Sequence, residues 1–173
     1  MPDRMIDISF GAYQWLVLEQ EPDACLLITK DIVAYRHFDA TAWEGSALRK
    51  WLNRDFLCLG FSDAEQESIL QTQVINSHDA YAEPGTARDH LNPILCADTM
   101  DKVFLLNATQ TFRYFPDTES RIAIWQNAGD WWLLRSGILI DYDGWMFSPT
   151  EGNFGVRPAL RIPTDVVSSS KLK

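Results

Sequence analysis

The residues best suited to recognition chemistry are aromatic and amide side chains in the last third of the chain. Aromatic rings stack on flat ligand faces, and amides beside them supply paired hydrogen-bond donors and acceptors. This combination suits a glycan, a peptide or a protein surface, although the same rings could instead pack a hairpin onto a sheet. The candidate ligand-binding residues are Trp125, Asn127, Trp131, Tyr142, Trp145 and Asn153.

Three carboxylates near these aromatics offer an alternative, enzymatic chemistry. Asp141, Asp143 and Glu151 lie close together in the sequence, and two carboxylates that face each other across a pocket can act as general acid and base. A Ser-His-Asp arrangement is disfavoured, because no histidine follows His90. No catalytic residue is assigned from these patterns.

Metal chemistry has little support in the sequence. His78, Asp79, Asp89 and His90 are suitable ligand types, but they straddle Pro84-Gly85 and match no rigid helical ligand pair. The three cysteines are widely spaced and odd in number, which disfavours a structural zinc site or a disulfide framework. We therefore expect no metal site and no cofactor.

Five other residues are predicted to organise the core rather than to bind a ligand. The tryptophans among them fall at apolar positions of regular elements, and aromatic residues dominate core energetics. Arg157 lies between apolar neighbours in the last predicted strand, where a buried arginine could pair with Asp101 or Glu44. The predicted structural residues are Trp43, Trp51, Asp101, Arg135 and Arg157.

Composition and charge narrow the classes of partner. The chain has 173 residues, of which 46% are hydrophobic and 23% are charged, as in one ordinary globular domain. Its net charge of −9 repels phosphate backbones, so we expect no nucleic-acid partner. The sequence lacks both an apolar leader and an apolar window long enough to cross a bilayer. We expect a cytoplasmic protein without membrane contact, although a surface or phage-associated protein could share these features.

Changes in hydrophobic period predict the elements of the first half. Residues 6–35 alternate as strands, and residues 46–58 switch to helical spacing behind Ser46 as the N-cap. A capping box follows from Ser62 to Glu65. In this motif the serine side chain bonds the glutamate backbone N–H, and the glutamate side chain bonds the serine backbone N–H. The first half therefore predicts a strand meander followed by two helices.

The second half returns mainly to strands. Residues 77–99 have the composition of a long loop, and residues 107–115 form a short capped helix. Asp143-Gly144 is a strong hairpin-turn signal. We expect one α+β domain over residues 1–165 and a flexible tail over residues 166–173. The later strands are predicted at residues 102–106, 131–136, 138–140, 145–147 and 154–162.

An ordered set of motifs spans roughly residues 6 to 163. The clearest is Gly155-Val156-Arg157-Pro158-Ala159-Leu160. The others, in chain order, are Phe10-Gly11-x-Tyr13-x-Trp15-x-Val17-Leu18, Trp43-Glu44-x-Ser46-x-Leu48-Arg49-x-Trp51-Leu52-Asn53, Asp101-Lys102-Val103-Phe104-Leu105-Leu106 and Trp132-x-Leu134-Arg135-Ser136. The set resembles a bacterial domain family of unknown function related to the formylglycine-generating-enzyme, or sulfatase-modifying-factor, branch of the C-type-lectin-like folds.

This resemblance implies a twisted antiparallel sheet with two main helices and long loops, in which the N- and C-terminal strands pair. It also implies loops on one face that bind sugars, proteins or peptides, which is support by fold analogy. Two activities of the wider group are not expected. Glu21-Pro22-Asp23 lies too near the N-terminus to be the calcium loop of sugar-binding lectins, and no cysteine follows Cys96 to form the redox pair of a formylglycine-generating enzyme.

Three functional hypotheses follow from the sequence. The first is a non-enzymatic recognition module for a glycan, peptide or protein, built on the late aromatic residues. The second is an enzyme that uses an unrecognised carboxylate acid–base pair. The third is an assembly domain of a phage-like or cell-surface array, in which an aromatic patch forms a homo-oligomer interface.

We predict that Arg157→Ala abolishes the cooperative thermal transition, because a buried arginine that organises the last strand cannot be truncated without leaving its partners unsatisfied. Circular dichroism during heating measures this transition. A folded variant with unchanged melting would contradict the structural role of Arg157.

Overall fold

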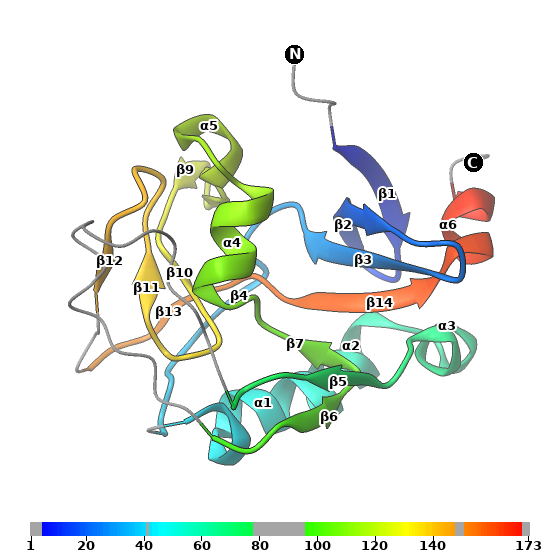
Figure 1. Ribbon diagram of the computed structural model, residues 1–173, viewed down its shortest axis with the longest axis horizontal. Helices are drawn as coiled ribbons and strands as arrows, with labels where there is room; N and C mark the ends of the chain where they lie inside the picture. Colours follow the sequence, from blue (N-terminus) through cyan, green and yellow to red (C-terminus); the bar gives the residue numbers. More distant parts are fainter. Residues whose placement is uncertain (1–4, 41, 78–95, 148–150, 171–173) are drawn as a thin grey trace.

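The computed structural model describes residues 5–40, 42–77, 96–147 and 151–170. They form a mixed α+β fold with two five-stranded sheets, two two-stranded ribbons and short helices (Figure 1). The sheets are mainly antiparallel, as the alternating segments of the sequence predict. None of the helices in these ranges is both long and apolar enough to span a bilayer.

The first sheet combines the N-terminal strands with two strands from later in the chain. In spatial order it contains β1 (Ile6–Phe10), β2 (Tyr13–Gln20), β3 (Ala24–Thr29), β14 (Ala159–Pro163) and β7 (Val103–Phe104), all antiparallel. Gly11 makes the turn between β1 and β2 at a φ of 59°, a conformation that glycine adopts without steric cost. The predicted strand meander is therefore present.

The pairing of the terminal strands differs from the expectation. β1 pairs with β2 at the edge of the sheet, whereas β14 lies between β3 and β7. The burial of each strand explains this arrangement. Residues Cys25 to Thr29 of β3 are all buried. The backbone N–H and C=O groups on both edges of β3 therefore need partners, and β14 supplies those of the second edge. In β1 only Ile8 and Phe10 are buried, which suits an edge strand.

The second sheet is built mostly from the C-terminal third of the chain. In spatial order it contains β12 (Met146–Phe147), β11 (Leu139–Ile140), β10 (Trp132–Leu133), β13 (Phe154–Val156) and β4 (Ala34–Arg36). Only the β10–β13 pair is parallel. Ile140 pairs with Met146, which confirms the hairpin predicted around Asp143-Gly144. The two small ribbons are β5 (Thr72–Val74) with β6 (Thr99–Asp101), and β8 (Ile124–Trp125) with β9 (Ala128–Gly129).

The helices begin at the caps that the sequence predicts. Ser46 accepts a hydrogen bond from the Arg49 backbone N–H, and capping boxes start at Ser62 and Asn107. Figure 1 shows α4 between the two five-stranded sheets, with α1 and α2 along the lower edge of the view. The helical segments are η1 (Trp43–Gly45), α1 (Ala47–Trp51), the π-helical η2 (Leu52–Phe56), α2 (Leu57–Gly60), α3 (Asp63–Ser68), α4 (Ala108–Tyr114), α5 (Thr118–Arg121) and α6 (Thr164–Ser170).

Helix α6 occupies most of the segment expected to be a flexible tail. Its Val167 side chain is fully buried, and Thr164 Oγ1 donates a hydrogen bond to the Glu21 carbonyl at 2.8 Å. The helix therefore packs onto the first sheet. The serine-rich composition of residues 168–170 concealed this role, because serine favours caps and turns over helix interiors.

The core contains several of the tryptophans predicted there. Trp15 and Trp43 are buried, and Trp15 Nε1–H donates to the Phe10 carbonyl at 2.8 Å. Trp51 is only half-buried, and the Arg36 guanidinium lies 4.1 Å from the centre of its ring. A cation–π contact of this kind lets the ring cover the core while its outer face meets a charged side chain.

A buried polar cluster joins the start of the helical region to β6. Asp101 Oδ1 accepts a hydrogen bond from Arg49 Nε at 2.7 Å. Its Oδ2 accepts from Trp43 Nε1 at 3.0 Å and from Thr99 Oγ1 at 2.6 Å. Asp101 therefore lies in a buried hydrogen-bonded cluster, and its ionic partner is Arg49 and not Arg157.

We expect Asp101→Ala to lower the free energy of unfolding by about 3–5 kcal/mol, because it leaves a partly buried guanidinium and two buried donors without their acceptor. Urea denaturation measures the change. The matched control is Asp55→Ala, which breaks the exposed ion pair with Arg54 and should leave the unfolding free energy almost unchanged. Equal effects of the two substitutions would contradict this account.

Gly155→Ala should destabilise the second sheet by about 1–3 kcal/mol through overpacking. An added Cβ would lie 2.6 Å from the Trp131 carbonyl oxygen and 2.7 Å from Ile32 Cδ1. Gly45→Ala is the control, since nothing lies within 4 Å of a Cβ there. The midpoints of thermal unfolding test the pair, and an unshifted midpoint for Gly155→Ala would show that the strand accommodates the methyl group.

Candidate functional site

The aromatic residues predicted to bind a ligand divide into an inward and an outward group. Trp125 is half-buried, with its ring centre 4.8 Å from that of Tyr35, and Trp131 is half-buried against the core. Tyr142 and Trp145 are 40% and 62% exposed on the β11–β12 turn. Two of the four rings are therefore exposed on the hairpin turn, while the other two mainly pack.

The two predicted amides lie at the surface. Asn127 is exposed at the tip of the β8–β9 ribbon, where Gln126 and Asn127 have φ values of 49° and 69°. Asn153 is exposed just before β13. Left-handed backbone at two successive residues is typical of a tight hairpin turn, so Asn127 serves the turn whatever else it contacts.

The carboxylates proposed as an acid–base pair lie around the same β11–β12 turn. Asp141 is 8% exposed, and its Oδ1 accepts a hydrogen bond from the Trp145 backbone N–H at 2.9 Å. Its own backbone N–H donates to the Trp145 carbonyl at 3.1 Å. Asp143 and Glu151 are exposed. The Asp141 carboxylate is thus used to shape the turn that presents Trp145.

The metal-like residues His78, Asp79, Asp89 and His90 lie outside the described residues. Among the residues that are described, no group of three or more His, Cys, Asp or Glu side chains is arranged to hold a metal ion.

A mainly apolar cavity of about 650 Å³ lies beside α5 and is here called the α5 cavity. The end of α4, the start of α5, β8 and the β1–β2 hairpin all contribute to it. Its apolar wall consists of Met5, Leu16, Phe115, Pro116, Ile122 and Ile124.

Arg157 borders the α5 cavity and is 1% exposed. Its Nε donates to the Thr29 carbonyl at 2.8 Å, and its Nη2 donates to the Lys30 carbonyl at 2.9 Å. The guanidinium carbon lies 4.7 Å from the Phe115 ring centre and 5.0 Å from that of Trp132. The predicted ion pair with Asp101 or Glu44 is absent from these contacts, because the two backbone carbonyls and two rings surround the guanidinium instead.

Burial lowers the pKa of Arg157 to about 10, and the nearby Asp31 carboxylate opposes part of this shift. The guanidinium is therefore still charged near neutral pH. Its Nη1 is buried and has no hydrogen-bond partner among the described residues. A buried donor without an acceptor costs free energy, more so on a charged group.

Three of the carboxylates that line the α5 cavity have a structural partner, and the fourth, Glu119, is exposed. Asp7 pairs with Lys30 at 2.5 Å, and Asp31 Oδ1 accepts from the Ile124 backbone N–H at 3.0 Å. Asp117 caps α5, and hydrogen bonds from the Ser120 backbone and side chain lower its pKa. These contacts hold the mouth of the cavity in shape.

One guanidinium connects the cavity wall to the exposed hairpin turn. Arg121 is buried at the end of α5; its Nη1 donates to the Phe115 carbonyl at 2.7 Å and its Nε donates to the Tyr142 carbonyl at 3.0 Å. Phe115 belongs to the cavity wall and Tyr142 to the β11–β12 turn. The cavity and the exposed aromatic turn are therefore neighbours across α5.

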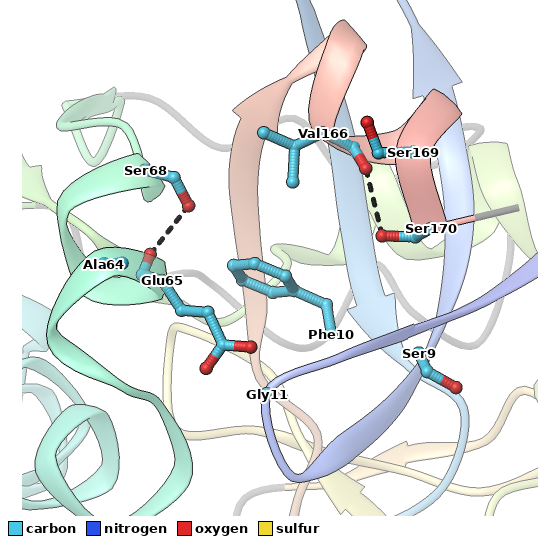
Figure 2. A pocket seen from close by; sticks show the side chains of 9 residues that line it. All are labelled: Ser9, Phe10, Gly11, Ala64, Glu65, Ser68, Val166, Ser169 and Ser170. Atoms are coloured by element: carbon cyan, nitrogen blue, oxygen red, sulfur yellow. Dashed lines mark hydrogen bonds between the residues drawn. The ribbon is translucent and has the colours of Figure 1, made fainter. Parts of the chain in front are cut away.

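A second cavity, of about 590 Å³, lies between α3, α6 and the β1–β2 turn (Figure 2). Figure 2 shows the Phe10 ring between serine side chains of the two helices. These hydroxyls bond their own helices: Ser68 donates to the Glu65 carbonyl and Ser170 to the Val166 carbonyl. This cavity presents polar groups that are already satisfied.

Two smaller cavities surround side chains that stabilise the fold. In one, Arg135 Nε donates to Asn76 Oδ1 at 2.9 Å, and its two terminal nitrogens donate to the Leu105 and Ile75 carbonyls. The other contains Asp101 with its partner Arg49. The α5 cavity differs from both because a buried charged donor at its border lacks a partner.

Sequence reasoning identified Arg157 but missed the α5 cavity. Its wall comes from β1, β2, the α4–α5 connection and β8, which are far apart in the chain. Ile122 and Ile124 are 41% and 38% exposed. These two isoleucines close together in the sequence were a local signal of an apolar surface.

Comparison with known proteins identifies a family but no described relative. A family model described as a domain of unknown function, DUF6273, matches residues 22–164. No curated protein and no solved structure matches the chain, so nothing found links it to the C-type-lectin-like or sulfatase-modifying-factor groups. Since the matched segment covers most of its length, the chain belongs to the DUF6273 family.

Proposed function

We propose that this domain is a non-enzymatic recognition module that receives the apolar part of a ligand in the α5 cavity. The observation that carries the proposal is the combination of an apolar wall with a fully buried, incompletely bonded guanidinium at one cavity. Ligand sites in proteins are typically mostly apolar concavities with a few placed polar groups.

The size and composition of the α5 cavity support a binding role. Its volume of about 650 Å³ lies within the range of about 300–1,000 Å³ that is usual for ligand pockets. The isoleucines at its mouth keep roughly two fifths of their surface in water, which a bound ligand would cover.

The neighbouring hairpin extends the surface on which a larger ligand could rest. Tyr142 and Trp145 are exposed rings on the turn that Arg121 links to the cavity wall. A glycan, peptide or protein whose apolar group enters the cavity would meet these rings across α5. In this proposal the aromatic hairpin lies at the edge of the recognition surface, and the α5 cavity lies at its centre.

The hydrogen bonding of the local carboxylates favours binding over acid–base catalysis. Asp7 is engaged by Lys30, Asp31 by the Ile124 amide, Asp117 by the first turn of α5 and Asp141 by the Trp145 amide. A general acid or base must exchange protons with a substrate, whereas these oxygens already serve the backbone or an ion pair.

One finer aspect belongs to the same proposal. A relationship to C-type-lectin-like folds would suit a binding role, and the ordered motifs support it, although the separation of β1 from β14 does not.

The test uses N-phenyl-1-naphthylamine, an uncharged probe whose fluorescence rises in apolar surroundings. We expect saturable binding to the wild type, and Ile122→Trp should weaken it by about ten-fold or more, or about 1.4 kcal/mol, by filling the cavity. Leu59→Trp is the control, because Leu59 is 78% exposed on α2 and does not line the cavity.

Wild-type binding that Ile122→Trp leaves unchanged would place the probe elsewhere and refute the α5 cavity as the site. Thermal melting of both variants establishes that each is folded. Light scattering distinguishes recognition from self-assembly, since a monomer that binds the probe has no need of an oligomer interface.

A further inference from the structure

Only one edge of the buried Arg157 guanidinium donates hydrogen bonds within the described residues. Nε and Nη2 both donate to main-chain carbonyls at the end of β3, those of Thr29 and Lys30. Nη1 is the remaining terminal nitrogen, and it is buried without a hydrogen-bond partner in the part of the chain that the structure describes. Its two N–H groups are unused there, in a residue that lines the α5 cavity.

The charge of this group is also incompletely compensated. No ion pair among the described residues includes Arg157, and its two hydrogen-bond acceptors are neutral carbonyls. Asp31 is the carboxylate whose field acts on it, but Asp31 Oδ1 is engaged by the Ile124 amide. Buried charges in proteins are normally paired, so an anionic acceptor is the group that best completes this site.

We propose that the α5 cavity binds a molecule with an apolar body that ends in a carboxylate, and that the carboxylate accepts hydrogen bonds from Arg157 Nη1. This inference rests on the proposed binding role of the cavity and specifies the ligand class. The apolar wall of the cavity, including Leu16, Ile122 and Ile124, would contact the body of the ligand.

The geometry favours a carboxylate over other head groups. A guanidinium and a carboxylate form charge-assisted hydrogen bonds that are stronger than neutral ones. An ammonium group has no acceptor for the Nη1 hydrogens and carries the same sign of charge as the guanidinium. A phosphate carries more charge and more acceptors than one terminal nitrogen can satisfy, and the exposed carboxylates Asp117 and Glu119 at the cavity edge would repel it more strongly.

The experiment compares octanoate, octanol and octylamine as competitors of N-phenyl-1-naphthylamine on the wild-type protein. The three share one aliphatic chain and differ in the head group. We expect octanoate to compete about ten-fold better than octanol, as a charge-assisted hydrogen bond requires, and octylamine to compete least. Octanol or octylamine competing as well as octanoate would count against a free acid, and the proposal is overturned if the peptide pair below shows no preference either.

A second pair identifies where the carboxylate comes from. Acetyl-leucyl-leucine presents a peptide C-terminus, and its amide is the uncharged counterpart. A preference for the free carboxylate in either pair supports the inference, and the tighter binder shows whether the natural source is a free acid or a peptide end. Equal competition within both pairs contradicts it.

A comparison of Arg157→Gln with the control Arg161→Gln tests whether the preference for octanoate depends on the Arg157 side chain. Arg161 lies on β14 and pairs with exposed or half-buried Glu19 and Glu21. If Arg157→Gln keeps a cooperative melt, it should bind the uncharged probe but lose the preference for octanoate, whereas Arg161→Gln should retain it. If it does not fold, the wild-type competition series decides alone.

The outcomes separate this inference from the proposed function. Probe binding that shows no preference for a carboxylate leaves the recognition role intact and refutes the ligand class. Absence of probe binding to the folded wild type refutes both.

Discussion

The structure depends on the contacts of one guanidinium at the point where the chain passes between the two large sheets. β13 belongs to the second sheet and β14 to the first, and Arg157 and Pro158 connect them. Arg157 bonds the carbonyls at the end of β3 and lies against Phe115 after α4 and Trp132 in β10. One side chain thus contacts both sheets and the helix between them. Because the group is buried, its partners must be accurately placed.

The same crossing creates the α5 cavity. The end of α4 packs its Phe115 ring on the guanidinium, and Pro116 then leads the chain outward into α5. Arg121 returns to bond the Phe115 carbonyl and the Tyr142 carbonyl. Phe115 therefore contacts two arginines, since its ring lies against Arg157 and its carbonyl accepts from Arg121. The residue that holds the sheets together also borders the cavity, and its Nη1 is buried without a hydrogen-bond partner among the described residues.

A second buried cluster stabilises the opposite side of the fold. Asp101 on β6 collects donors from Trp43, Arg49 and Thr99, while Asn53 bonds the backbone of Lys102 and Val103 next to it. These contacts attach the helical region to β6 and β7. Both clusters use side chains to satisfy main-chain or charged groups where short strands offer few ladder hydrogen bonds.

Local patterns in the sequence determined the elements whose causes are local. The N-caps at Ser46, Ser62 and Asn107 and the Asp143-Gly144 turn depend on residues three or four positions apart, and each was found where it was predicted. Burial of Arg157 could likewise be predicted from its apolar neighbours. Only the tertiary structure decided that β14 pairs with β3 and that Asp101 forms an ion pair with Arg49. It also decided that residues from β1, α5 and β8 line a cavity beside Arg157. Those outcomes depend on contacts between distant segments, and hydrophobic period and capping carry no information about which distant segments will meet.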